Sequence, residues 1–322
     1  MSELLQPLRQ AQRVHLSGYQ ARDYEVIDYH MYELPGTGLS FRGPPPALDG
    51  DYFACIGAAQ TFGCFCESPY PSLLAERLGM PALNLGYGGA GPEFYASHEA
   101  LLSYLNSARF VVVQVMSGRS QSNSMFHAGG LEYLTRRADG RRLSSDRAYR
   151  ELLEGNQLWR RFPLPRVGRK VGKLLALPRA HRVVNETRHA WIESYRSLLT
   201  RITVPKVLLW FSKRQPEYQE RYASVSTLFG EFPHLVNARM VREVRELCDH
   251  YCECVSSRGS PQPLRSRFTG LPTTVNPADD RPDLAEARPW SHNRYYPSPE
   301  MHVDAADALE PVCRHLIGGS VK

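Results

Sequence analysis

The chain has 322 residues, of which 42% are hydrophobic and 22% charged, and its formal net charge is +6. These values are typical of a soluble globular protein that is long enough to bury a full core. Its longest apolar runs, 110–116 and 207–211, are far too short to span a membrane. Because the first residues lack the apolar stretch of a secretory signal, we expect a cytoplasmic protein.

Residues 1–50 predict an N-terminal cover segment, in which a short helix over 2–13 leads into a loop rich in Tyr, Gly and Pro. Residues 51–322 predict a single α/β domain that carries a basic insertion at about 127–185.

Strands and helices alternate through this domain. Strands are predicted over 52–57, 81–85, 109–116 and 205–211, with a weaker candidate over 273–276. Helices are predicted over 71–78, 93–107, 187–201 and 238–256, and a C-terminal helix follows a proline-bounded loop. The alternation favours a flavodoxin-like three-layer sandwich, in which helices cover both faces of a mostly parallel sheet.

Seven cysteines are scattered along the chain, an odd number that favours a reduced compartment without a disulfide framework. Cys248, Cys252 and Cys254 fall within the predicted helix 238–256 and lack the paired spacing of a zinc site. We interpret them as core residues and expect no metal.

Arginine and lysine recur densely between residues 119 and 188. Most of this charge is expected to be solvated surface. The same composition is typical of a lid or groove for an anionic ligand such as a phosphate, sulfate, nucleotide or acidic glycan, and a membrane-surface patch or an oligomer contact are further interpretations. No helix-turn-helix, zinc-finger or RNP pattern accompanies the charge, so no specific nucleic-acid partner is expected.

Polar and glycine-rich turns follow the predicted strands at 57–63, 86–91, 117–124 and 212–218. In parallel sheets, ligands bind beyond the carboxyl ends of the strands. We therefore expect the site to be assembled from these four turns and from the loop that precedes the last helix at His302.

The order of these turns resembles that of the SGNH hydrolases and their acyltransferase relatives, whose first block reads Gly-Asp-Ser-x-Thr-x-Gly. Here the frame reads GAAQTFG over 57–63, "NLGYGGAG" over 84–91 stands for the second block, and His302 precedes the last helix. The resemblance covers about half of the chain and implies a flavodoxin-like α/β enzyme that is cytosolic or secreted.

The chemistry of that family is incomplete in this sequence. Alanine replaces the aspartate and the nucleophilic serine at 58 and 59, the third block has an asparagine only at 123, and Pro299 stands three residues before His302. Without a serine at 59, the usual acyl-enzyme route cannot run there.

The first turn also resembles the Gly-Asn-Cys-Gln opening of a capsular-polysaccharide biosynthesis family, which implies binding of coenzyme A or adenosine phosphates. Most closely, the chain is similar to an uncharacterised bacterial domain family of unknown function with this same first turn, which implies kinship without a reaction.

The expected ligand-binding residues lie on the strand-end turns. Backbone N–H groups at 60 and 61 could bind an anion, although Thr61 could equally cap the helix; Arg119 could clamp a carboxylate, phosphate or sulfate. The glycines could admit a ligand or form a tight packing turn. The full set is Gln60, Thr61, Asn84, Gly86, Gly88, Gly89, Ser117, Arg119, Asn123, Ser124, Lys213 and Arg214.

His302 is the expected general base, with Glu300 as the carboxylate that orients it. Cys64 and Cys66 lie close to the vacant serine position and are alternative nucleophiles, although inert buried thiols are common.

These features predict a transferase that moves an acyl group from an activated donor to a hydroxyl or amine of a glycan or small metabolite, by direct attack with His302 as base. The donor would be a coenzyme A thioester or an adenosine phosphate compound. The alternatives are a sulfotransferase with an adenosine phosphosulfate donor, a non-catalytic SGNH-like binding module, and an esterase or hydrolase with a displaced nucleophile.

Overall fold

The computed structural model describes residues 18–154, 165–279 and 288–318. The predicted helix over 2–13 lies outside these residues. Side chains are described for all of this range except 165–175.

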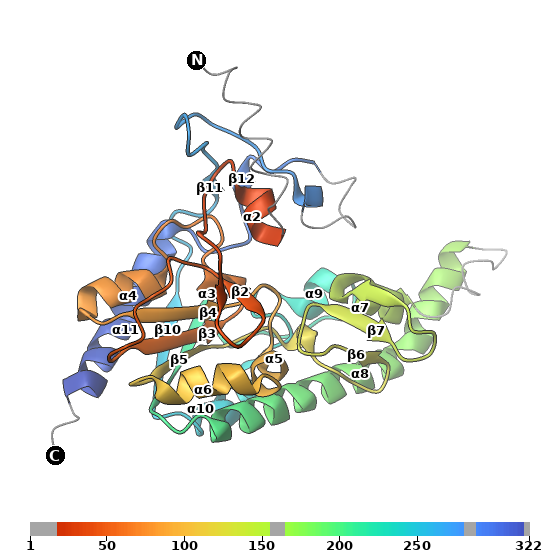
Figure 1. Ribbon diagram of the computed structural model, residues 1–322. Helices are drawn as coiled ribbons and strands as arrows, with labels where there is room; N and C mark the ends of the chain where they lie inside the picture. Colours follow the sequence, from red (N-terminus) through yellow and green to blue (C-terminus); the bar gives the residue numbers. More distant parts are fainter. Residues whose placement is uncertain (1–17, 155–164, 280–287, 319–322) are drawn as a thin grey trace.

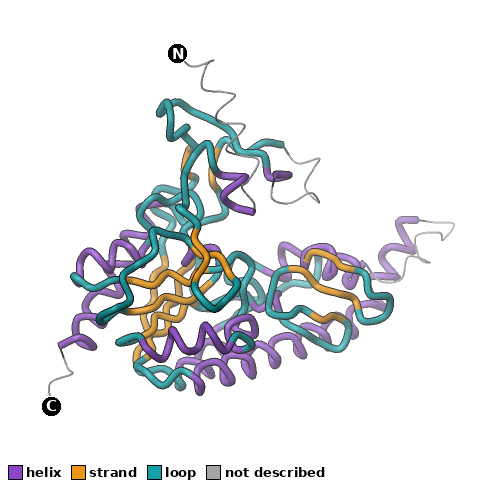
Figure 2. Tube along the Cα trace, in the orientation of Figure 1, coloured by secondary structure: helices purple, strands orange, loops and turns teal. Residues whose placement is uncertain are grey.

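A five-stranded parallel sheet forms the centre of the molecule (Figures 1 and 2). Its strands are β3 (Phe53–Gly57), β4 (Ala82–Gly86), β5 (Val111–Gln114), β9 (Lys206–Ser212) and β10 (His250–Val255). Every residue of β3 and β5 is buried, as expected for strands covered on both faces. The spatial order β4-β3-β5-β9-β10 corresponds to the flavodoxin-like order 2-1-3-4-5.

Helices cover both faces of the sheet, so the predicted three-layer α/β sandwich is confirmed. On one face lie α4 (Tyr70–Leu78) and α11 (Pro299–Gly318), which contribute Leu74 and Met301 to one hydrophobic cluster. The other face carries α5 (Pro92–Ala96), α6 (Glu99–Ser107), α8 (Pro165–Arg201) and α10 (Ala238–Arg245). Their apolar side chains form a second cluster, which includes Trp191.

Two predicted helices are corrected by the structure. The segment 238–256 is helical only in α10, and its remainder forms strand β10, because its second half has the period-two burial of a strand that pairs with β9. Cys252 and Cys254 consequently point to the same face of the sheet and are buried. The segment 93–107 is divided into α5 and α6, which are separated by Ser97 and His98.

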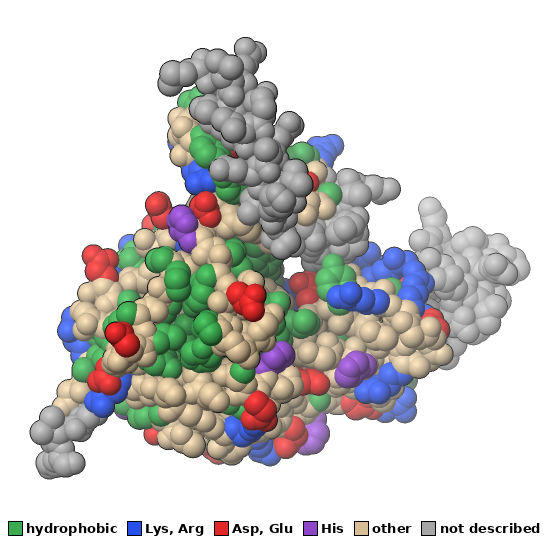
Figure 3. Space-filling model, in the orientation of Figure 1, with side chains coloured by type: hydrophobic (Ala, Val, Ile, Leu, Met, Phe, Trp, Pro, Cys, Tyr) green, Lys and Arg blue, Asp and Glu red, His purple; other side chains and the backbone are tan. Residues whose placement is uncertain are grey.

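A smaller lobe lies beside the sheet. It contains an antiparallel sheet of β6 (Phe126–His127), β7 (Tyr133–Arg136) and β8 (Arg142–Ser144), together with α7 (Ser145–Glu154) and α9 (Val225–Phe229). Helix α8 joins this lobe to the main domain, because Val183 packs in the core of the lobe while Trp191 packs against the central sheet. The predicted helix 187–201 is the last part of α8. Figure 3 shows Lys and Arg side chains gathered on this lobe, at the right.

The N-terminal residues are tied to the edge of the main domain. They form α2 (Gly18–Asp23) and a hairpin of β1 (Tyr32–Leu34) and β2 (Leu39–Phe41), and Arg42 donates hydrogen bonds to the carbonyl groups of Phe62 and Gly63. The remaining short elements are α3 (Ala59–Phe62), η2 (Gly118–Ser120), β11 (Gln262–Pro263), η4 (Pro277–Asp279) and β12 (His292–Asn293). In 273–276, Val275 makes an isolated bridge with Trp290.

Among the described residues, no helix combines the length and the apolar character that crossing a membrane requires.

Candidate functional site

A cavity of about 750 Å³ opens at the carboxyl ends of β3, β4 and β5. The strand order reverses between β3 and β5, and such a switch point is where ligands bind in open parallel sheets. The three strand-end turns form its floor, the lobe forms one wall, and α2 with the loop before α11 forms the other. Aromatic side chains contribute much of the lining: Tyr19, Phe62, Tyr87, Tyr133, Phe232, Trp290, Tyr295 and Tyr296.

The turn after β3 is fixed by hydrogen bonds to the neighbouring strand β5. Gln114 of β5 accepts hydrogen bonds at its Oε1 from the backbone N–H of Ala58 (3.0 Å) and from Thr61 Oγ1 (2.8 Å). Thr61 is completely buried and does not line the cavity, so its side chain supports the turn. Ala58, Ala59 and Gln60 do line the cavity.

The first turn leaves polar groups available to a ligand. Within the described residues, no hydrogen bond uses the backbone N–H of Ala59 or Gln60. The Gln60 side chain is 2% exposed, and neither of its polar atoms makes a hydrogen bond of normal geometry. The opposite wall adds Gln20, whose Nε2 is likewise buried without a partner. Unpaired buried amides are costly, so these groups favour a polar ligand.

The glycine-rich turn after β4 packs closely against the first turn. A Cβ at Gly86 would stand 2.1 Å from the backbone nitrogen of Phe62, so only glycine fits there. Asn84 joins the two turns, because its Nδ2 donates to the Thr61 carbonyl and its Oδ1 accepts from the Gly86 N–H. Gly86, Gly88 and Gly89 line the cavity, whereas the Asn84 side chain acts beneath it.

The turn after β5 divides the predicted polar cluster into two groups. Ser117 and Arg119 line the cavity, and Asn123 and Ser124 do not. Asn123 Oδ1 instead accepts from two backbone N–H groups of its own turn, and the Ser124 N–H donates to Glu186.

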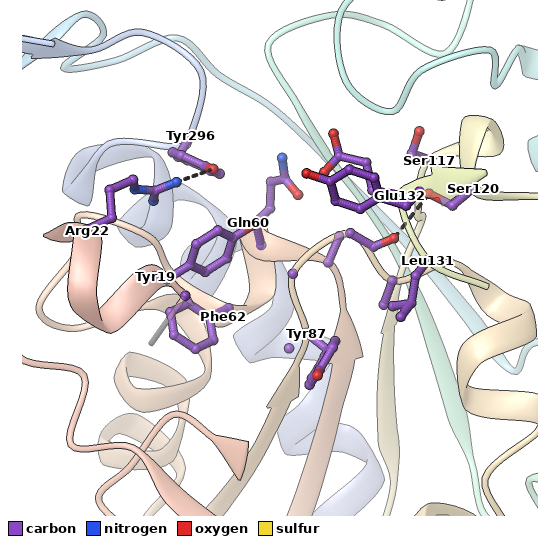
Figure 4. Close-up of a pocket in the computed structure, with 18 of the residues that line it drawn as sticks. Tyr19, Arg22, Gln60, Phe62, Tyr87, Ser117, Ser120, Leu131, Glu132 and Tyr296 are labelled. Carbon is purple, nitrogen blue, oxygen red and sulfur yellow. Dashed lines mark hydrogen bonds between the residues drawn. The ribbon is translucent and has the colours of Figure 1, made fainter. Parts of the chain in front are cut away.

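The Arg119 guanidinium lies between two carboxylates. Its Nη2 is 3.2 Å from Glu132 Oε1 and its Nη1 is 3.1 Å from Asp146 Oδ2. Glu132 itself lines the cavity and is the carboxylate among the described lining residues. Figure 4 shows Ser117, Ser120 and Glu132 facing Tyr19 and Gln60 across the cavity. Sequence reasoning missed Glu132, because the lobe that carries it has no recognisable site pattern.

Lys213 and Arg214, on the turn after β9, do not line the cavity. Lys213 Nζ donates to Ser260 Oγ and to the Arg294 carbonyl, both at 2.7 Å. Arg214 donates to several carbonyl groups of the segment 230–236, including that of Pro233 at 2.6 Å. Both residues therefore stabilise loops beside the site.

His302 is not brought to the cavity, although it begins the last helix as the sequence predicts. It is completely buried between the rings of Tyr70 and Phe211, and its Nδ1 accepts from the Tyr70 N–H at 3.2 Å. Burial lowers the pKa of His302 to about 3, so the imidazole is neutral. Glu300 is exposed on the first turn of α11 and does not line the cavity either.

Cys64 and Cys66 are buried beneath the first turn and do not line the cavity. Burial raises the pKa of Cys66 to about 12, which opposes formation of a thiolate. Neither thiol is therefore placed to attack a ligand in the cavity. In the described part of the chain, no group of three or more His, Cys, Asp or Glu side chains is arranged to hold a metal ion.

Two further arginines line the cavity and differ in whether a carboxylate pairs with them. Arg22 forms a buried pair with Asp23 at 2.6 Å and lies over the ring of Tyr19. Arg142, at the rim, lies over the Tyr133 ring at 4.7 Å and forms no ion pair within the described residues.

Comparison with known proteins gives a family and remote structural similarity. The model of a family described as a domain of unknown function (DUF6473) matches residues 18–130 and 174–317. No curated protein sequence matches the chain.

Three solved structures illustrate the remote similarity. A Corynascus thermopiles (Myceliophthora fergusii) carbohydrate esterase family 2 enzyme with a carbohydrate-binding domain is 12% identical, with 86% of this chain and 69% of that chain covered and a TM-score of 0.38. A catalytic mutant of an acetylxylan esterase from Geobacillus stearothermophilus is 12% identical, with 83% and 94% covered and a TM-score of 0.35. An extracellular lipase from Streptomyces rimosus is 11% identical, with 83% and 100% covered and a TM-score of 0.41.

Proposed function

The chain belongs to the DUF6473 family, and from its cavity we propose that it is an SGNH-like acyltransferase that binds donor and acceptor together. The observation that carries this proposal is the first turn, where a ligand-accessible floor is kept although Ala59 stands at the position of the nucleophilic serine of the SGNH hydrolases. Because alanine at 59 offers no nucleophile for an acyl-enzyme, transfer at this turn requires that two ligands be brought into contact.

The first turn supplies what an acyl transfer requires at the carbonyl oxygen. The N–H groups of Ala59 and Gln60 point out of the start of α3 without partners among the described residues. Two adjacent backbone donors stabilise the negative charge that develops on a carbonyl oxygen during attack. The alanine methyl groups at 58 and 59 leave room for the donor above them.

Glu132 takes the role that the sequence assigned to His302. It is the carboxylate on the wall of the cavity, and its link to Arg119 holds it in place. In the proposed step, the acceptor oxygen or nitrogen attacks the thioester carbonyl carbon while its proton passes to Glu132. The carbon–sulfur bond then breaks, and the thiol leaves with that proton.

The basic groups of the lobe support an anionic donor. Arg142 lies at the rim of the cavity without an ion pair among the described residues, so a phosphate can engage it without displacing a carboxylate. The aromatic lining can contact an adenine or a sugar ring. A coenzyme A thioester has the phosphates and the adenine that these contacts would bind, so we assign it as the donor. The acceptor would be a hydroxyl or amine of a glycan or small metabolite.

Calorimetric titration with acetyl-coenzyme A, adenosine bisphosphate and a sugar nucleotide tests the proposal. We expect acetyl-coenzyme A to bind, and Arg142→Ala to weaken it about tenfold. Binding of adenosine bisphosphate but not of the thioester would favour sulfuryl transfer. If acetyl-coenzyme A binds but no acceptor causes the release of thiol, the protein is a binding module. If none of the three donors binds, the proposal is refuted.

Glu132→Gln tests the assigned base. The carboxamide preserves size and the contact with Arg119 but cannot take a proton, so thiol release should fall about 100-fold or more while donor affinity is retained. Glu99→Gln, an exposed carboxylate of α6 outside the cavity, is the matched control. Equal activity of both variants would remove Glu132 from the mechanism.

A further inference from the structure

Tyr295 and His234 form a polar pair behind one wall of the cavity. Tyr295 lines the cavity, and its hydroxyl oxygen is 3.2 Å from His234 Nε2, with the two rings nearly parallel. His234 is buried, and its own carbonyl accepts from the Gly118 N–H at 2.8 Å. The pair is thereby fixed to the turn after β5 that forms part of the cavity floor.

The partner of His234 Nδ1 determines which way the hydrogen bonds run. Nδ1 lies 2.9 Å from the Gly230 carbonyl oxygen, which can only accept, so Nδ1 must carry the proton. In a neutral imidazole, Nε2 is then an acceptor. The Tyr295 hydroxyl must donate its single proton to Nε2.

The surroundings keep His234 neutral. Burial and the positive charge of Arg119 lower the pKa of His234 well below its ordinary value, against a smaller opposite effect of the hydrogen bond to Gly230. Arg214 adds a further positive charge nearby. Tyr295 lies beside His234; desolvation at the cavity wall raises its pKa, so the phenol stays protonated although 42% of the residue is exposed.

We propose that His234 holds Tyr295 with its phenolic oxygen as a hydrogen-bond acceptor toward the cavity, and that this oxygen recognises an O–H or N–H group of the ligand. The phenol has one proton, and His234 uses it, so only oxygen lone pairs remain for the ligand. Gln60 of the first turn lines the same cavity as Tyr295. The inference rests on the proposed function, in which the ligand group is the attacking hydroxyl or amine.

The direction of the hydrogen bond between Tyr295 and His234 can be measured without any ligand. Long-range proton–nitrogen correlation spectra of histidine-labelled protein should show His234 as the Nδ1–H tautomer, unchanged over the range from about pH 8 to pH 5. Tyr295→Phe should move the Nε2 resonance downfield, because it loses its donor. An Nε2–H tautomer, or a His234 that titrates near its ordinary pKa, would overturn the inference, since the phenol would then present its proton to the cavity.

Kinetics with acetyl-coenzyme A and glucosamine as probes test the recognition. Tyr295→Phe and His234→Leu should each raise the KM for glucosamine about tenfold without changing the KM for the donor. In His234→Gln the carboxamide can still accept from the phenol, so its KM for glucosamine should be close to that of the wild type. Tyr104→Phe is the control, because the Tyr104 hydroxyl donates to the Pro35 carbonyl. Equal KM for glucosamine in Tyr295→Phe and the wild type would overturn recognition by Tyr295.

The two proposals fail separately. Absence of donor binding in the wild type refutes the transferase, while the tautomer of His234 still decides whether the Tyr295 hydroxyl donates to it. An Nε2–H tautomer together with donor binding and thiol release refutes only the inference that the Tyr295 oxygen is an acceptor toward the cavity.

Discussion

Replacement of Gln60 by leucine should separate stability from binding. The carboxamide is buried with neither polar atom in a hydrogen bond of normal geometry. An unsatisfied buried amide costs about 1–3 kcal/mol, and leucine has nearly the same volume without that cost. We therefore expect Gln60→Leu to raise the free energy of unfolding by about 1–2 kcal/mol and Tm by several degrees, and to weaken donor binding about tenfold through loss of the carboxamide.

Gln114→Leu is the matched control for this effect. Its Oε1 accepts from the Ala58 N–H and from Thr61 Oγ1, so removal leaves the buried Ala58 N–H unpaired and leaves Thr61 Oγ1 with the Tyr70 hydroxyl, and it should destabilise the protein by about 1–3 kcal/mol. Thermal and urea unfolding of both variants, followed by circular dichroism, give the two changes. A Gln60→Leu protein that is less stable than the wild type would refute the reasoning, because its carboxamide would then be satisfied by the protein itself.

Three further predictions concern groups around the site. The folded-state pKa of His302 is depressed to about 3, so between pH 7 and pH 5 the unfolded chain binds a proton at this histidine and the folded protein does not. The free energy of unfolding should therefore fall by about 2 kcal/mol over this range because of His302. Urea unfolding of His302→Gln at both pH values should show a decrease that is smaller by this amount. Cys66 should resist iodoacetamide at about pH 8 until urea unfolds the protein, as peptide mass mapping would report; rapid native labelling would contradict its burial. Gly86→Ala should abolish folding or cost several kcal/mol, because the new Cβ would stand 2.1 Å from Phe62 N, whereas Gly50→Ala, with open space around it, should unfold like the wild type; similar midpoints for both would refute the close packing.

The sheet and the position of the cavity could be predicted because they depend on local patterns. Apolar strands followed by glycine-rich turns mark the carboxyl edge, and the turns at 57–63 and 86–91 indeed meet there. The sequence predicts helix over 250–255 because the helical pattern of 238–245 continues into this segment without a break, whereas its pairing with β9 makes it a strand.

The individual site residues were less predictable, because burial is a tertiary property. His302 has the expected position in the chain, yet Tyr70 and Phe211 enclose it. Tyr295 and His234 are 61 residues apart and come together only through the folding of two loops. No short spacing in the sequence indicates such a pair.

The most direct test of the central claim is intact-protein mass spectrometry during incubation with acetyl-coenzyme A and glucosamine, with thiol release followed in parallel. Because Ala59 occupies the position of the nucleophilic serine and Cys64 and Cys66 do not line the cavity, direct transfer predicts thiol release that depends on the acceptor, from a protein whose mass does not change. A protein that gains the mass of one acetyl group at the rate of thiol release would contradict it.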